Sequence, residues 1–153
     1  MTATLSDSEA CAKLLAEHEC LRFLLLACEG EASKILDGRE TTGRQLLSTL
    51  LELRDAFEDH NREEESQLRP LLLGADSFGE VRIAGMVADH MQEHAALREA
   101  LRDAVEPNLP DRSARAALEV VSRLRRHMDA EEAQFLNERV LRDDLVSLDA
   151  FGG

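Results

Sequence analysis

The sequence predicts an all-α protein folded as an up-down-up-down four-helix bundle, and three observations lead to this prediction. The composition is 44% hydrophobic but only 3% aromatic, without tryptophan or tyrosine, which is typical of helices around an aliphatic core. Apolar residues recur at helical spacing in four long segments, at about residues 6–37, 42–73, 77–105 and 111–142. The connections between these segments are short, which makes neighbouring helices antiparallel.

The length and the charge limit what the chain is expected to bind. A chain of 153 residues fits one domain, and we expect residues 1–153 to form it, with 143–153 as a frayed tail. The net charge of −13 repels phosphate groups, so neither nucleic acid nor a membrane is an expected partner. The N-terminus lacks a basic region followed by an apolar run, which predicts a cytoplasmic protein.

The first helix is expected to begin at the capping box Ser6-Asp7-Ser8-Glu9 and to end at Asp37-Gly38. Its apolar stripe contains His18. Of the cysteines on this helix, Cys11 shares the face of the histidine and is expected in the core. Cys20 points away from that face and is expected to be exposed.

The other helices have similar start and stop signals. The second is expected to begin at the capping box Thr42-Gly43-Arg44-Gln45, with Pro70 kinking or ending its last turn. The third is expected to begin at the capping box Ser77-Phe78-Gly79-Glu80 and to end before the loop 106–111, which holds two prolines. The fourth starts near that loop, and its pattern decays after Leu141.

All five histidines of the chain lie at positions predicted to face the core: His18, His60, His90, His94 and His127. One buried histidine is usually a neutral ring bonded to a neighbour, but five such rings would need many polar partners inside the protein. His90 and His94 are four residues apart, a spacing that brings two rings to one face of a helix. Convergence on a metal explains all five histidines together.

An internal repeat adds two carboxylates to this set. His60-x3-Glu64-Glu65-x-Gln67 in the second helix matches His127-x3-Glu131-Glu132-x-Gln134 in the fourth. Glu64 and Glu131 therefore lie one turn after a histidine and on its face, whereas Glu63 and Glu65 are expected to be solvated. Five imidazoles and two carboxylates exceed one tetrahedral zinc site and suit two ions that share carboxylates. Iron or manganese is favoured, with zinc as an alternative.

A ferritin-like di-iron bundle is disfavoured, because it needs a glutamate three residues before a histidine. The residues at that spacing are Leu15, Phe57, Val87, Met91 and Leu124.

The order and helix placement of the motifs instead resemble the hemerythrin family, including the bacterial hemerythrin-like (HHE cation-binding) domains, over about Leu14 to Leu141. The motifs are Glu17-His18, His60-x3-Glu64 followed by Pro70, His90-x3-His94 and His127-x3-Glu131. Oxygen-carrying hemerythrins have H-x4-D at the last motif, whereas many bacterial relatives have H-x3-E. This chain offers both Glu131 and Glu132, and the internal repeat favours Glu131.

The resemblance implies two non-haem iron ions joined by an oxo or hydroxo bridge. In such a site His90, His94 and His127 would hold one ion, His18 and His60 the other, and Glu64 and Glu131 would bridge them, with Glu132 as the alternate for the last ligand. The ion with two histidines would keep an open position for O2, NO or peroxide. The residues expected to line this ligand pocket are Leu14, Leu21, Leu53 and Phe57. Leu14 lies one turn before His18, where a second ligand from the first helix could stand.

The family implies the binding of O2 or a related small ligand, for sensing, storage or delivery, as the leading function. The competing functions are a redox enzyme acting on peroxide or NO, and an iron-handling or repair protein. An enzyme needs a proton source beside the open position, and without tyrosine only Glu17, Glu132 or Cys11 could serve. The sequence therefore favours a metal- and oxygen-binding protein over an efficient enzyme, and it identifies no protein partner.

Overall fold

The computed structural model describes residues 6–74, 79–134 and 136, and the regular secondary structure in these ranges is helical. The helices are α1 (Asp7–Leu36), α2 (Arg44–Gly74), α3 (Glu80–Val105) and α4 (Pro110–Gln134). The all-α prediction is confirmed for this part of the chain. The predictions made for the helix end near Leu141 and for the tail 143–153 lie outside the described residues.

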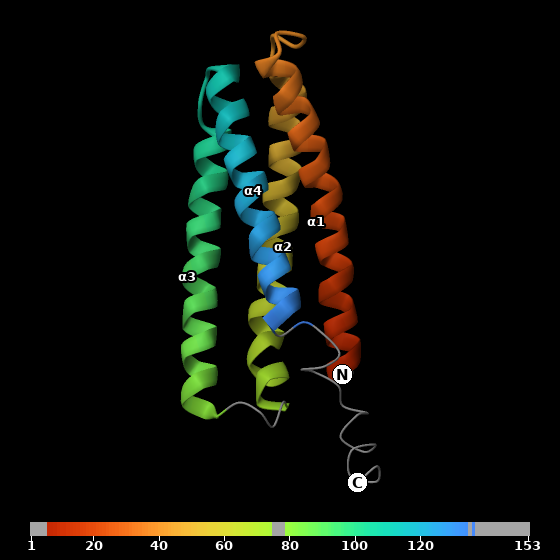
Figure 1. The fold of residues 1–153 in the computed structure, drawn as a ribbon, viewed down its shortest axis with the longest axis vertical. Coiled ribbons are helices and arrows are strands. Elements are labelled where there is room, and N and C mark those ends of the chain that lie inside the picture. The colour runs from red at the N-terminus through yellow and green to blue at the C-terminus, as the bar shows by residue number, and fades with distance from the viewer. Residues whose placement is uncertain (1–5, 75–78, 135, 137–153) are drawn as a thin grey trace.

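The four described helices lie side by side along one long axis (Figure 1). α1 packs against α2 and α4, and α3 packs against the same two helices. The α1–α2 and α3–α4 connections lie at one end of the molecule, whereas α2 ends and α3 begins at the other (Figure 1). The helices that carry the carboxylate repeat, α2 and α4, are therefore diagonal partners. None of the described helices combines the length and the apolar character that crossing a membrane requires.

Both ends of α1 follow the sequence prediction. The Ser6 hydroxyl accepts a hydrogen bond from the backbone N–H of Glu9 (3.2 Å), and the Glu9 carboxylate accepts one from the backbone N–H of Ser6 (2.8 Å), which is a complete capping box. At the other end Gly38 has a φ of 77°, a left-handed conformation that glycine adopts without strain. The next N–H, of Arg39, then donates to the carbonyl of Lys34 (2.8 Å), which closes the last turn.

Of the other predictions about helix ends, the capping box at the start of α2 is wrong. The Thr42 hydroxyl accepts from the N–H of Arg44, two residues on, so the capping box expected there does not form. α3 begins at Glu80 with Gly79 as its N-cap, and glycine has no side chain to accept a hydrogen bond. Ser77 and Phe78, the first half of the capping box expected there, lie outside the described residues. α2 continues through Pro70 to Gly74. The burial of the next residues, Leu71 and Leu72, stabilises the turn that the proline weakens.

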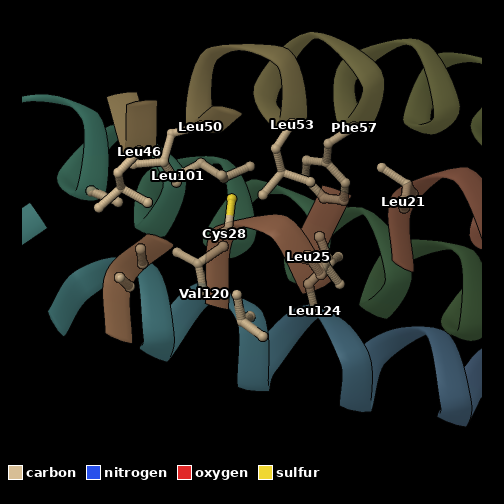
Figure 2. Close-up of a cluster of buried hydrophobic side chains, with 14 of the residues drawn as sticks. Leu21, Leu25, Cys28, Leu46, Leu50, Leu53, Phe57, Leu101, Val120 and Leu124 are labelled. Carbon is tan, nitrogen blue, oxygen red and sulfur yellow. The ribbon is translucent and has the colours of Figure 1, made fainter. Parts of the chain in front are cut away.

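The apolar core consists of two clusters with a layer of polar side chains between them. The larger cluster contains Leu21, Leu25, Leu53, Phe57 and Leu124 (Figure 2). The smaller cluster contains Cys11, Leu14, Leu71, Leu72 and Ile83. On α1, α2 and α3 the histidines stand between residues of the two clusters. We call these five histidines, Glu64 and Glu131 the polar layer; each of its members is at most 5% exposed.

The cysteines of α1 follow the prediction. Cys11 is buried in the smaller cluster, and Cys20 is exposed.

Candidate metal centre

The polar layer forms two groups of side chains whose ligand atoms lie within 4.8 Å of one another. The first group is Glu64, His90, His94, His127 and Glu131. The second group is His18, His60, Glu64 and Glu131. The two glutamates belong to both groups, and all members are buried. The helices thus bring together every histidine that the sequence singled out, together with Glu64 and Glu131.

Glu64 turns one carboxylate oxygen toward each group. Its Oε2 lies 2.7 Å from Nε2 of His60 and 3.8 Å from Nε2 of His18. Its Oε1 contacts Nε2 of His90 and lies 3.4 Å from Nε2 of His94. This is the orientation that a carboxylate needs to join two neighbouring ions.

Glu131 is oriented in the same way from the diagonal helix. Its Oε2 lies 3.4 Å from Nε2 of His18. Its Oε1 contacts Nε2 of His127 and lies 3.7 Å from Nε2 of His90. α2 and α4 therefore present equivalent carboxylates to the bundle axis, as the internal repeat predicts.

Most of the inward-facing atoms of the polar layer lack hydrogen bonds, whereas Nε2 of His90 and Oε1 of Glu64 are bonded to each other. Within the described residues, Nε2 of His18, His60, His94 and His127, Oε2 of Glu64 and both oxygens of Glu131 are buried without a hydrogen-bond partner. Buried polar atoms are rarely left unpaired, since each costs about 1–3 kcal/mol. Imidazole nitrogens and carboxylate oxygens that converge without partners are a suitable donor set for metal cations. The residues present therefore fit the ions that the sequence implies.

The outward nitrogen of four of these rings is held by a second set of glutamates. His18 Nδ1 lies 2.9 Å from Glu132, His60 Nδ1 2.8 Å from Glu17, His94 Nδ1 3.1 Å from Glu65, and His127 Nδ1 2.7 Å from Glu93. An ionised carboxylate only accepts hydrogen bonds, so each ring donates from its Nδ1–H. The Nε2 lone pair of each ring then faces the interior, which is the tautomer that binds a metal.

These outer pairs repeat in the two halves of the chain. Glu17 of α1 reaches the histidine of α2, and Glu93 of α3 reaches the histidine of α4. Glu65 of α2 reaches His94 of α3, and Glu132 of α4 reaches His18 of α1. The halves α1–α2 and α3–α4 are thus related by an approximate two-fold arrangement, in which each histidine is oriented by a carboxylate from a neighbouring helix.

Arginines fix two of the outer glutamates at matching positions, four residues after His18 and His94. Arg22 donates to Glu132 (2.5 Å), and Arg98 donates to Glu65 (3.3 Å). Burial alone would raise the pKa of Glu132, but its hydrogen bonds with Arg22 and His18 outweigh that effect and lower it. Glu132 is thereby kept ionised as an acceptor for His18.

The two central carboxylates have opposite pKa shifts in the metal-free protein. Burial would raise the pKa of Glu64, but hydrogen bonds with the surrounding histidines outweigh it and lower the pKa well below its usual value. Burial raises the pKa of Glu131 well above its usual value, and repulsion from Glu64 adds to that effect. A cation between these carboxylates would relieve both the burial cost and the repulsion.

Two histidines also differ in their proton affinity. Burial would lower the pKa of His60, but Glu64 and Glu17 raise it above its usual value. The pKa of His127 is lowered to about 4, chiefly by burial, with repulsion from His94 and His90 adding to the effect. His127 is therefore a neutral ring at neutral pH, as metal binding requires.

Sequence reasoning did not identify the outer carboxylates as a set. Glu65 was expected to be solvated, but it is half-buried and bonded to His94, so that prediction is wrong. Glu132, the alternate for the last ligand, belongs to neither group of the polar layer and faces Nδ1 of His18 instead. Their common signal is position: each outer glutamate directly precedes a histidine or directly follows Glu64 or Glu131.

The residues expected to line the ligand pocket lie on both sides of the polar layer. Leu21, Leu53 and Phe57 are buried together in the larger cluster (Figure 2). Leu14 is fully buried in the smaller cluster, one turn before His18. His18 is therefore flanked along α1 by an apolar residue on each side, Leu14 and Leu21.

Comparison with families of known proteins supports the same conclusion as the geometry. The family model of the hemerythrin HHE cation-binding domain matches residues 10–138, which include every member of the polar layer. Comparisons with curated proteins and with solved structures gave no significant match. The match covers most of the 153 residues, and the chain therefore belongs to the hemerythrin family of HHE cation-binding domains.

Proposed function

We propose that this chain is a single hemerythrin-like domain over residues 1–153, an up-down-up-down four-helix bundle that holds two non-haem iron ions. His90, His94 and His127 hold one ion, and His18 and His60 hold the other. Glu64 and Glu131 bridge the pair. The orientation of the two glutamates, each with one oxygen toward each group, supports this assignment of ligands.

The function that this site supports best is reversible binding of O2 or a related small ligand, for sensing, storage or delivery. The two iron ions, when bound, supply reversible electron transfer and one exchangeable coordination position. The observation that carries the proposal is the difference between matching positions of the two halves. His90, one turn before His94, contributes a third nitrogen to its group, whereas Leu14, one turn before His18, contributes none.

Apolar residues keep this open position dry, and two of the candidate proton donors near it are already bonded to histidines. Leu14 is 0% exposed, and its neighbours in the smaller cluster are apolar, which favours small ligands of low polarity. Glu17 and Glu132, two of the proton donors considered for an enzyme, are instead engaged by His60 and His18. These contacts favour a binding protein over a redox enzyme.

Replacing Leu14 by histidine tests the proposal directly. The variant gives the first half the ligand that His90 gives the second, so two iron ions should still bind while the open position is filled. Wild-type protein loaded with ferrous iron without air should bind about two ions per chain and gain a visible absorption band with O2 that disappears on degassing. Leu14→His should keep the metal and lose the band, whereas the control Leu14→Met, which remains apolar, should keep both.

The alternatives correspond to other outcomes of this experiment. Fewer than about two ions per chain would contradict the dinuclear site. Rapid irreversible oxidation with consumption of added peroxide or NO would indicate the redox enzyme, and release of iron to an acceptor would indicate an iron-handling protein. Tighter retention of manganese than of ferrous iron in a competition experiment would contradict the choice of metal, because sites with these ligands ordinarily bind ferrous iron more tightly than manganese.

A further inference from the structure

One buried side chain beside the polar layer has no role in the arrangement described above. Asn61 directly follows His60 in α2 and is 0% exposed. Neither its Nδ2 nor its Oδ1 has a hydrogen-bond partner in the part of the chain that the structure describes. A primary amide offers two N–H donors and a carbonyl acceptor, and burying them unpaired is unfavourable. The described residues do not offset this cost.

The other half of the bundle holds an apolar residue at the matching position. In the repeat, Asn61 after His60 corresponds to Met128 after His127. Met128 is also 0% exposed and is part of the larger apolar cluster. The bundle thus accommodates an apolar side chain at the matching position, so helix packing by itself does not explain an amide at residue 61.

The neighbours of Asn61 on α2 indicate where the amide lies. Glu58, three residues before it, and Glu65, four residues after it, both accept hydrogen bonds from Arg98 of α3. Phe57, one turn before it, packs edge-on against His94 of α3, with ring centroids 6.0 Å apart. This side of α2 therefore faces α3 near His94. Around the circumference of α2, Asn61 lies between this α3-facing side and the central carboxylate Glu64.

We propose that the amide of Asn61 forms a hydrogen bond with the small ligand of the metal centre. The Nδ2–H donates to the ligand, which is a species of two or three heavy atoms with an available lone pair. The amide thereby favours ligands that accept a hydrogen bond over wholly apolar molecules of the same size. This inference rests on the proposed function, because it requires a ligand at the centre.

The experiment uses the full chain and has one readout without metal and one with metal. Asn61→Leu keeps the branched shape and removes the polar atoms, and Asn61→Met reproduces the residue of the other half. Met128→Leu is the matched control, since it changes the buried residue at the matching position of the other half without changing its polarity. The unfolding temperature of each metal-free protein is measured with a chelator present. The dissociation constant of azide is then measured by titration of the oxidised iron-loaded proteins.

We expect the Asn61 variants to keep or raise the unfolding temperature of the metal-free protein, because no bond within the fold is lost. We expect their affinity for azide to fall about tenfold, the factor that corresponds to one hydrogen bond of ordinary net strength. Met128→Leu should change the affinity by less than about twofold.

Unchanged azide affinity in both Asn61 variants would overturn the inference. A loss of folding or a clear drop in the metal-free unfolding temperature in both would also overturn it, because the amide would then support the fold. Wild-type protein that holds fewer than about two ions per chain would overturn the proposed function first, and the metal count separates that failure from a failure of the amide.

Discussion

Replacing Glu131 by glutamine should stabilise the metal-free protein while weakening metal binding. Both oxygens of Glu131 are buried and have no hydrogen-bond partner among the described residues, and the carboxylate is repelled by Glu64. Glutamine is nearly the same size as glutamate but cannot ionise, so the substitution removes the cost of burying an unpaired charge and should raise the free energy of unfolding at neutral pH by about 1–3 kcal/mol. For a chain of this size that corresponds to an increase of about 2–12 °C in the unfolding temperature.

The sign of the pH dependence follows from the raised pKa of Glu131. The unfolded chain releases this proton near pH 4.5, whereas the folded metal-free protein retains it to a higher pH. The wild type therefore loses stability as the pH rises above 4.5, and the glutamine variant lacks this loss. The gain from the substitution should be absent at about pH 4 and should grow toward neutral pH.

Urea unfolding of chelator-treated protein across this pH range measures the effect, and metal content after iron loading measures the binding. Glu132→Gln is the control. The pKa of Glu132 is raised by burial but lowered further by Arg22 and His18, so its loss should slightly destabilise the protein at neutral pH. A Glu131→Gln variant that is less stable than the wild type at pH 7 would refute the reasoning, as would one that binds both ions with unchanged affinity.

Two further predictions concern the histidines. Glu93→Gln removes the carboxylate that orients His127, so the affinity for metal, measured in competition with a chelator, should fall about 10–100-fold while the helix content stays the same. Metal retention equal to that of the wild type would contradict the role given to Glu93. His127→Gln should reduce the pH dependence of the metal-free protein's stability between pH 6.5 and about 4. In this range the unfolded wild-type chain binds a proton at His127 that the folded protein does not bind, so the wild type loses stability as the pH falls. Free energies of unfolding at several pH values measure that slope, and identical slopes for the two proteins would show that the ring is not held neutral.

Much of the fold and of the polar layer could be predicted from the sequence, because helical periodicity converts spacing into position on a face. The stripes around His18 and His60 placed these rings inside, and the repeat placed Glu64 and Glu131 beside them; all four are buried. The start of α3 was predicted less well, because its N-cap is Gly79, which has no side chain and therefore gives no capping signal in the sequence.

The outer carboxylates could not be predicted in the same way. Glu65 appears in the sequence as one of a run of acidic residues, yet in the bundle it is bonded to His94 on another helix. The spacing of residues within one helix fixes their relative directions, but it does not fix how far that helix is rotated or shifted against its neighbours. That rotation decides which glutamate meets which Nδ1, and it also places Glu132 outside the polar layer and Glu131 within it.

By itself, therefore, the sequence determined that five histidines and two glutamates would share the interior of a helical bundle. Only the tertiary structure decided that each central glutamate turns one oxygen toward each group of histidines. It also buried the amide of Asn61 without a hydrogen-bond partner among the described residues, whereas the apolar Met128 at the matching place of the repeat needs none. The physical reason is that periodicity specifies the buried face of each helix, whereas hydrogen bonding across helices depends on the distances that packing sets.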